Sequence, residues 1–219
     1  MEKIVAADLP VLFSEIGRQM EINRDLLTKM DAEMGDGDLG LTMSKGFRAL
    51  PDVMADALKE EEDLGKLLFK TGMKLSSIVP STMGILMASG IAEGGKALIG
   101  RPYIGAKELT QFLRNFCNGV ARRGKCQPGD RTVLDAMNGA AKFAEAALDS
   151  NPHASLLAVA DAARQGAIDG VENTKGMLPK FGKAVVHRAK ALGMPDQGAV
   201  VGGLFVAGIY EYIASSLEP

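Results

Sequence analysis

Hydrophobic residues recur at helical spacing along nearly the whole chain. Near the N-terminus they are Leu12, Ile16, Met20, Leu27 and Met30. Residues three, four or seven positions apart fall on one face of an α-helix, and the strict alternation of a half-buried strand is scarce here. The pattern therefore predicts a mostly helical protein.

Eight helical segments are predicted, with ends placed to within about 2 to 4 residues. They cover residues 10–30, 42–60, 64–76, 82–98, 106–123, 132–148, 153–170 and 197–216. A further segment, 175–192, carries many Lys and Gly residues and is compatible with either a helix or a mobile loop. The breaks contain Gly or Pro and are too short for interdomain linkers. We expect one all-α domain over residues 1–219, with a bundle-like core.

Charge and cysteine usage narrow the class of protein. The chain has 25 Lys and Arg against 27 Asp and Glu, so no overall field favours nucleic acid or an anionic membrane. The first residues lack the pattern of a signal peptide, and no stretch approaches the roughly 20 apolar residues of a membrane span. We expect a cytoplasmic protein. Cys117 and Cys126 lack metal-ligand spacing and are expected to be reduced thiols.

The stretch MDAEMGDGDLGLT places Asp31, Asp36 and Asp38 at and beyond the end of the first predicted helix. Carboxylates there repel one another and meet the negative end of the helix dipole. A divalent metal would remove both costs, and the intervening glycines let alternate side chains turn toward one point. Hard oxygen ligands favour Mg²⁺.

Other interpretations of this stretch are weaker. A solvated turn would explain any single Asp, but not three together. An EF-hand would need an acidic residue at loop position 12, where the chain has Phe47 or Thr42, depending on the register. An aspartyl-phosphate phosphatase would need a strand before the nucleophile, and a helical pattern precedes it here.

A second loop, SSIVPSTMG, contains Ser81, Thr82 and Gly84 at the start of a predicted helix. Free N–H groups at such a start can bind phosphate, although plain helix capping explains the same residues. In a third loop, CQPGDRTVLDA, Asp130 could cap the next helix with Arg131 and Thr132 in its first turn. A basic residue in a first turn is locally unfavourable, so Arg131 gains interest only if an anion lies nearby.

The last loop gathers Lys180, Lys183, Arg188 and Lys190, which could form a cationic flap over phosphates or simply a solvated face. His153 and His187 lack the context of a catalytic triad and are expected at the surface.

Taken in order, DAEMGDGDLGLT, TGMKLSSIVPSTMG, RRGKCQPGDRTVLDA and GMPDQGA resemble the nucleotide-binding L subunit of dihydroxyacetone kinases. The most specific part is D-x(4)-D-x-D-x-G, followed about 90 residues later by G-K-x-x-P-G-D-[KR]-T. The resemblance implies a barrel of eight antiparallel helices with a nucleotide at one end. It also implies that Asp31, Asp36 and Asp38 form the catalytic metal site for two Mg²⁺ ions, and that the glycines leave room for phosphate.

Position by position, the resemblance implies a set of nucleotide-binding residues. Ser81, Thr82 and Gly84 would contact phosphate. The others would lie near the nucleotide: Gly129, Asp130, Thr132, Lys183 and Asp196.

The same resemblance implies phosphoryl transfer to a small ketose held by a separate K-type subunit, so the chain would be catalytically incomplete alone. The phosphate donor would be ATP, or else bound ADP that is recharged by a phosphohistidine carrier of the phosphotransferase system. The second route is slightly favoured, because separate subunits are characteristic of it. Assembly of this chain into a homo-oligomer is a further possibility that the sequence leaves open.

Several positions depart from the family pattern: residues 80–84 read PSTMG, and Leu39, Lys183, Val185 and Gln197 replace usual residues. These departures leave a tetrulose kinase subunit, or a noncatalytic regulatory module that binds nucleotide, as alternatives.

Overall fold

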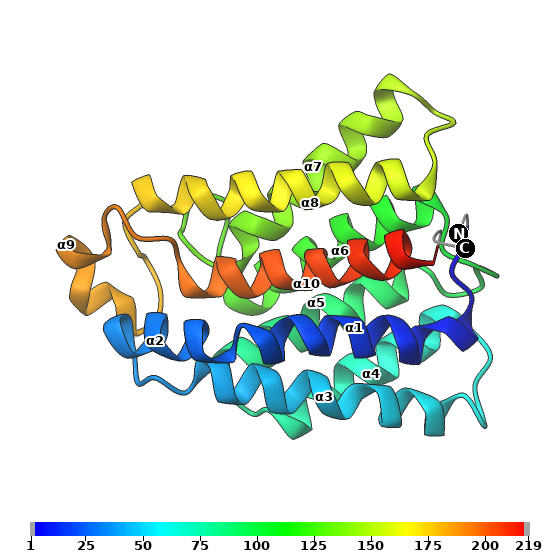
Figure 1. Ribbon diagram of the computed structural model, residues 1–219, viewed down its shortest axis with the longest axis horizontal. Helices are drawn as coiled ribbons and strands as arrows, with labels where there is room; N and C mark the ends of the chain where they lie inside the picture. Colours follow the sequence, from blue (N-terminus) through cyan, green and yellow to red (C-terminus); the bar gives the residue numbers. More distant parts are fainter. Residues whose placement is uncertain (1–2, 217–219) are drawn as a thin grey trace.

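The computed structural model describes residues 3–216, and it is built from α-helices (Figure 1). Within that range the only β-pairing is one antiparallel bridge between Ile4 and Ile104. The helices are α1 (Leu9–Ile22), α2 (Arg24–Met34), α3 (Leu39–Ala57), α4 (Leu64–Ile78), α5 (Thr82–Lys96), α6 (Ala106–Gly124), α7 (Val133–Ser150), α8 (Leu156–Asn173), α9 (Arg188–Ala191) and α10 (Gln197–Ser215). The predicted all-α class is confirmed.

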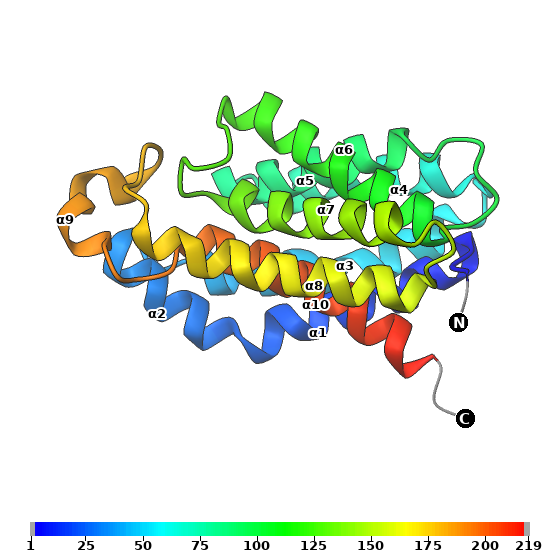
Figure 2. The same ribbon diagram turned by 90° about the horizontal axis from the view of Figure 1, so that it is seen from above.

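The long helices close into a ring. Each packs on the next in the order α1, α3, α4, α5, α6, α7, α8 and α10, and α10 returns to α1. With α2 extending α1 along the same edge, this ring corresponds to the eight predicted helices (Figure 2). The expected barrel is therefore present.

The first predicted helix, 10–30, is not continuous, which corrects the sequence prediction. It breaks at Asn23, where the backbone leaves helical geometry with φ −102° and ψ 9°. The Asn23 side-chain amide donates to the carbonyl of Gln19 at 2.9 Å. Asn competes in this way for backbone groups that a continuous helix would use, so the chain turns and restarts as α2.

Aromatic side chains fill the middle of the barrel. The ring of Phe205 on α10 lies 5.3–6.4 Å, centroid to centroid, from those of Phe13, Phe47, Phe112 and Phe116. These four rings come from α1, α3 and α6, so Phe205 joins helices from different sides of the ring. Offset and edge contacts at these distances are the favourable geometries for aromatic pairs.

Helix α10 is the one described helix that is long and apolar enough to cross a membrane, which the sequence analysis did not anticipate. Many of its apolar residues face the interior of the barrel. It packs against α1, α7 and α8, and buries Val201, Phe205 and Ile209 in the barrel. A helix that is apolar on most sides is typical of a buried core position.

The segment between α8 and α10 is neither one helix nor a plain loop. It contains two 3₁₀ turns, η2 (Thr174–Gly176) and η3 (Lys183–His187), before the short α9. Figure 1 shows it in orange at the end of the barrel where α2 ends. His153 is exposed, as expected, whereas the side chain of His187 lies outside the described part of the structure.

Candidate nucleotide and metal site

Three loops and the segment before α10 meet at one end of the barrel and enclose a cleft of about 460 Å³. The loops are those between α2 and α3, α4 and α5, and α6 and α7. Eight of the predicted site residues line the cleft: Asp31, Asp36, Asp38, Ser81, Thr82, Thr132, Lys183 and Asp196. Segments predicted from motifs far apart in the sequence therefore form one site.

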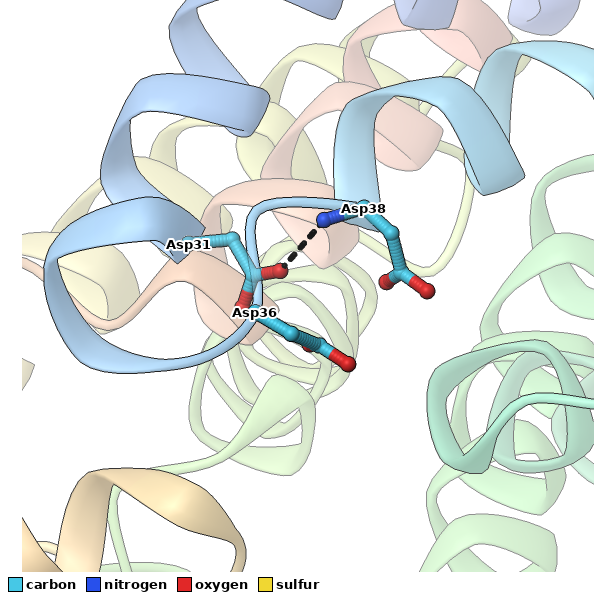
Figure 3. A group of neighbouring side chains, drawn as sticks. All are labelled: Asp31, Asp36 and Asp38. Carbon is cyan, nitrogen blue, oxygen red and sulfur yellow. Dashed lines mark hydrogen bonds between the residues drawn. The ribbon is translucent and has the colours of Figure 1, made fainter.

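Asp31 organises the acidic loop. It lies in the last turn of α2 and is buried. Its Oδ2 accepts a hydrogen bond from the backbone N–H of Asp38 at 3.0 Å (Figure 3). The same oxygen accepts from the backbone N–H of Leu39 at 3.2 Å. It thus caps the start of α3, and the side chain of Asp38 makes no capping bond of its own. Because Asp31 caps the N-terminus of α3, the carboxylate of Asp38 is not needed as a cap and can face the cleft.

The three carboxylates converge. One oxygen from each of Asp31, Asp36 and Asp38 lies within 4.8 Å of the others, and Asp36 and Asp38 are exposed (Figure 3). Three hard oxygen ligands at this spacing, open to the cleft on one side, fit a Mg²⁺ ion that takes its remaining ligands from water or phosphate. The donor set does not suit a soft metal.

Lys183 lies over this cluster. Its ammonium group donates to Asp36, and both side chains are more than half exposed. The contact lowers the pKa of Asp36, and Asp36, with smaller contributions from Asp38 and Asp31, raises the pKa of Lys183. The site thus pairs a concentrated negative charge with the exposed ammonium group of Lys183.

The glycines of the acidic loop make room for protein atoms. A Cβ at Gly40 would lie 2.0 Å from the carbonyl oxygen of Arg24, so this glycine allows α3 to approach α2 closely. Gly37 has φ +77°, which is readily adopted only by glycine. These two positions explain how Asp36 and Asp38 are turned toward Asp31.

The loop before α5 places Ser81 and Thr82 at the cleft. Ser81 is the N-cap, and its Oγ accepts from the N–H of Gly84 at 3.1 Å. Gly84 itself does not line the cleft, and a Cβ there would lie 2.2 Å from the carbonyl oxygen of Val79. Gly84 is therefore required for the tight turn into α5.

The loop before α7 corrects the predicted cap. Thr132, not Asp130, is the N-cap, and its Oγ1 accepts from the N–H of Leu134 at 3.1 Å. Asp130 instead accepts from Lys180 Nζ at 2.6 Å, which lowers the pKa of Asp130. Neither Asp130 nor Gly129 lines the cleft. They lie beside it and support its wall.

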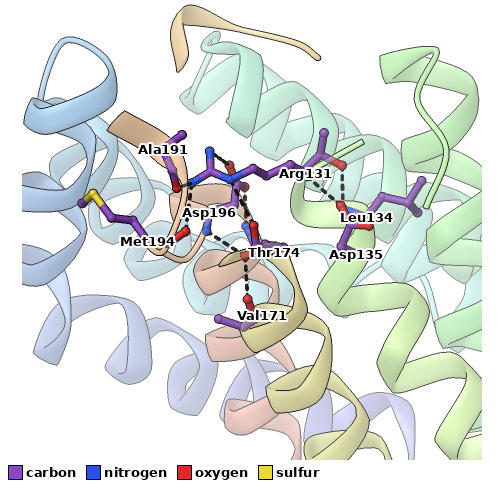
Figure 4. Close-up of polar contacts among 10 residues, drawn as sticks. Arg131, Leu134, Asp135, Val171, Thr174, Ala191, Met194 and Asp196 are labelled. Atoms are coloured by element: carbon purple, nitrogen blue, oxygen red, sulfur yellow. Dashed lines mark hydrogen bonds and ion pairs between the residues drawn. The ribbon is translucent and has the colours of Figure 1, made fainter. Parts of the chain in front are cut away.

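Arg131 is not in the first turn of α7, as the sequence suggested, but precedes it with φ +61°. Its side chain is fully buried, and the anion that it meets is Asp196, with 3.7 Å between Arg131 Nη1 and Asp196 Oδ1 (Figure 4). Asp196 also caps α10 by accepting from the N–H of Ala199 at 2.9 Å. Burial raises the pKa of Asp196 to about 6, although the charge of Arg131 opposes the shift.

Sequence reasoning missed the apolar part of the cleft. Its wall includes Leu39, Met83, Leu86, Val133 and Phe181. Because apolar residues beside helix starts are common in any helical protein, their spacing carried no distinguishing signal. Together with the carboxylates and Lys183, they give the cleft one charged and one apolar region, an arrangement typical of sites for amphipathic small molecules.

Comparison with known proteins identifies the family. The DAK2 domain model matches residues 33–211 of this chain. The chain belongs to the DAK2 family. It is 30% identical over 189 residues, 86% of each chain, to the ADP-binding subunit DhaL of dihydroxyacetone kinase 2, a PEP-dependent enzyme of Listeria innocua. It is also 30% identical over 175 residues to the corresponding DhaL subunit of Escherichia coli, covering 80% of this chain and 81% of that one.

Longer proteins match as well. A D-erythrulose kinase of Mycolicibacterium smegmatis is 32% identical over 177 residues, which cover 79% of this chain but 30% of the kinase. The structure of C. freundii dihydroxyacetone kinase with AMP-PNP and Mg²⁺ superposes with a TM-score of 0.66 at 22% identity, covering 94% of this chain and 34% of that one. At this identity the superposition supports the shared fold.

Proposed function

We propose that this chain is the nucleotide-binding subunit of a dihydroxyacetone-type kinase and acts in the cytoplasm. The main support is the convergence of Asp31, Asp36 and Asp38 at the mouth of a cleft that also has an apolar wall. The relatives named as ADP-binding subunits match over 86% and 81% of their own length. The proposed ligand is ADP or ATP with Mg²⁺, two ions being expected from the resemblance.

In this function the three aspartates hold the metal, whose chemistry is to neutralise phosphate charge during transfer. The chain's own residues supply position and selectivity. Ser81 and Thr82 present the N-terminus of α5 to phosphate, and the apolar wall holds the adenine. Lys183 exchanges its contact with Asp36 for a phosphate oxygen, because an anion in the cleft competes for the same ammonium group. Catalysis of this kind depends on positioning and charge, with little covalent work by the protein.

The phosphoryl acceptor is proposed to be a small ketose carried by a separate K-type subunit. The chain alone should therefore bind nucleotide without phosphorylating free dihydroxyacetone. The names of the DhaL relatives, which are subunits of PEP-dependent kinases, support a donor route in which bound ADP is recharged by a phosphohistidine carrier. Native mass spectrometry of the purified chain tests this route, because ADP should then copurify.

Calorimetric titration with ADP in the presence and absence of Mg²⁺ tests the central proposal. Asp36→Ala should lower the affinity for Mg·ADP by about 100-fold, equivalent to about 2.7 kcal/mol. Asp25→Ala removes an exposed carboxylate from α2, outside the cleft, and serves as the control, since Asp25 forms an ion pair with Arg24. Wild-type affinity in Asp36→Ala, or affinity unaffected by a chelator, would contradict the proposal.

A tetrulose acceptor is the second candidate, because an erythrulose kinase is among the relatives. Adding a K-type partner with either dihydroxyacetone or erythrulose separates the two substrates by their initial rates. If nucleotide binds but no K-type partner restores turnover, the regulatory-module alternative is favoured instead.

A further inference from the structure

Residues 177–192, which we call the flap, form one wall of the cleft and carry Lys183. Three lysines connect the flap to the rest of the chain. Lys183 donates to Asp36, and Lys190 donates to the carbonyl of Glu33 at 3.4 Å. Lys180 donates through Nζ to the carboxylate of Asp130 at 2.6 Å and through its backbone N–H to the carbonyl of Asp130 at 3.4 Å. The side chains of Lys180 and Lys183 are more than half exposed. Exposed ion pairs contribute little to stability. These contacts alone therefore hold Lys183 over the carboxylates only weakly.

Beneath the flap lies a small apolar cluster, separate from the barrel core. Ala184 and Ala191 pack there with Met34 of α2, and Met194 borders the cluster. Alanine side chains bury little area, so this cluster supplies limited hydrophobic stabilisation. The flap also begins and ends near glycines with space around them, Gly176 and Gly193. Its packing alone therefore leaves it among the less stable parts of the molecule.

The two ends of the flap meet at one side chain. Arg131 Nε donates to the carbonyl of Thr174 at 3.3 Å, before the flap. Arg131 Nη2 donates to the carbonyls of Ala191 at 3.2 Å and Met194 at 3.0 Å, at and just after its end. The Nη1 group lies 3.7 Å from Asp196 and has no hydrogen-bond partner among the described residues (Figure 4).

Two features of Arg131 are energetically unfavourable by themselves. Burying a guanidinium removes its hydration, which costs several kcal/mol unless partners replace the water. Arg131 also adopts a left-handed backbone conformation with φ +61°, which is unfavourable for a residue with a side chain. The planar fork of arginine presents five N–H donors in a fixed geometry, which suits donation to several carbonyls at once.

We propose that Arg131 is a positioning residue that closes the base of the flap and thereby keeps Lys183 over the metal and phosphate site. Arg131 lines the cleft, but its donors point to backbone carbonyls and to Asp196, so we assign it no direct contact with the nucleotide. Its predicted effect is on how long the nucleotide is retained. The part concerning nucleotide rests on the proposed function, whereas the part concerning the flap does not.

Hydrogen–deuterium exchange of the intact, nucleotide-free chain tests the closure of the flap. Arg131→Met removes the donors but keeps the length and apolar stem of the side chain. Amides of residues 177–192 should then exchange about tenfold faster, as expected for the loss of about 1.4 kcal/mol of local stability, while those of α4 to α6 stay within about twofold. Arg131→Lys retains the charge and should restore part of the protection.

Arg114→Met is the matched control. Arg114 also donates through its fork, to Glu145 and Asn138, but it joins α6 to α7 away from the flap. This variant should leave exchange of the flap unchanged. If Arg131→Met does not fold, Asp196→Asn keeps an acceptor for the cap of α10 while removing the anion, and it should loosen the flap in the same direction. Wild-type exchange over 177–192 in whichever variant folds overturns the proposal.

The nucleotide part is measured separately with a fluorescent ADP analogue and Mg²⁺. Dissociation should be about tenfold faster from Arg131→Met than from wild type, intermediate from Arg131→Lys and unchanged from Arg114→Met. Faster exchange of the flap with an unchanged dissociation rate overturns the positioning role. If the wild-type chain does not bind the analogue, the proposed function fails, while the exchange experiment still decides whether Arg131 closes the flap.

Discussion

The interior of the barrel and its cleft end are stabilised by different forces. In the interior, Phe205 and its four aromatic neighbours are all buried, and the contacts are apolar. At the cleft end, buried charge replaces buried hydrocarbon, and Asp31, Arg131 and Asp196 bond to backbone groups of neighbouring segments. Apolar contacts are nondirectional, whereas these polar contacts fix particular groups in particular places.

The interior should therefore determine mainly the stability of the fold, and the cleft end mainly ligand binding. A change in the interior should affect the unfolding of the whole chain, whereas a change at the cleft end should act mainly on local order and ligand binding. On the flap, even the apolar side chains of Leu178, Phe181 and Val186 are exposed. A segment with so little burial can rearrange at low cost, which a site that must admit and release a ligand requires.

The largest expected effect is in the interior. Phe205→Ala should lower the free energy of unfolding by about 3–5 kcal/mol, because it leaves a cavity among four rings. Chemical denaturation measures the change. Phe143→Ala, at a ring that is 39% exposed on α7, is the control and should cost much less. Equal losses in the two variants would mean that the aromatic centre is not the principal support of the barrel.

The second prediction concerns Asp31, which combines both kinds of role. Asp31→Asn keeps an oxygen that can accept from the N–H of Asp38 but loses the charge. It should therefore weaken Mg·ADP binding by about 100-fold with little change in stability. Asp31→Ala also loses the cap of α3, which should lower the free energy of unfolding by about a further 1 kcal/mol. Calorimetry and denaturation of both variants separate the contributions, and identical stabilities would exclude the capping role.

The same contrast explains what could be predicted from sequence. The helices follow from apolar spacing, because core burial enforces that spacing, and the acidic trio follows from its unusual charge density. The break at Asn23 was missed because one polar residue hardly disturbs a periodic pattern. The contacts of Arg131 could not be foreseen, since its partners are backbone carbonyls 43 to 63 residues further along the chain, and carbonyls leave no sequence signal.

A pH titration of stability should distinguish the two regions further. The pKa of Asp196 is raised to about 6 from an ordinary value of 3.8, so the folded chain binds this proton more tightly than the unfolded chain. Its stabilising contribution is complete below about pH 4 and is lost as the pH rises through 6.

Asp196→Asn should abolish this component, so the difference in unfolding free energy between wild type and variant should change by about 2 kcal/mol between pH 4 and pH 7. Denaturation at a series of pH values measures it, with Phe143→Ala as a variant that alters no titrating group. A pH-independent difference would show that Asp196 titrates normally despite its burial.

The smallest expected effect compares the two thiols, one in each region. Cys117 lies on α6 in the barrel wall, and burial raises its pKa to about 12. Cys126 lies in the loop before α7, and its pKa is raised as well, with Thr132 opposing the shift through a hydrogen bond.

At pH 8 the thiolate fraction of Cys117 should be about 1000-fold below that of a free cysteine, so iodoacetamide should modify Cys126 first. Peptide mass spectrometry of the native chain measures the two rates. Modification of Cys117 as fast as Cys126 would imply that the barrel wall opens as readily as the cleft end, which is contrary to the division of forces between them.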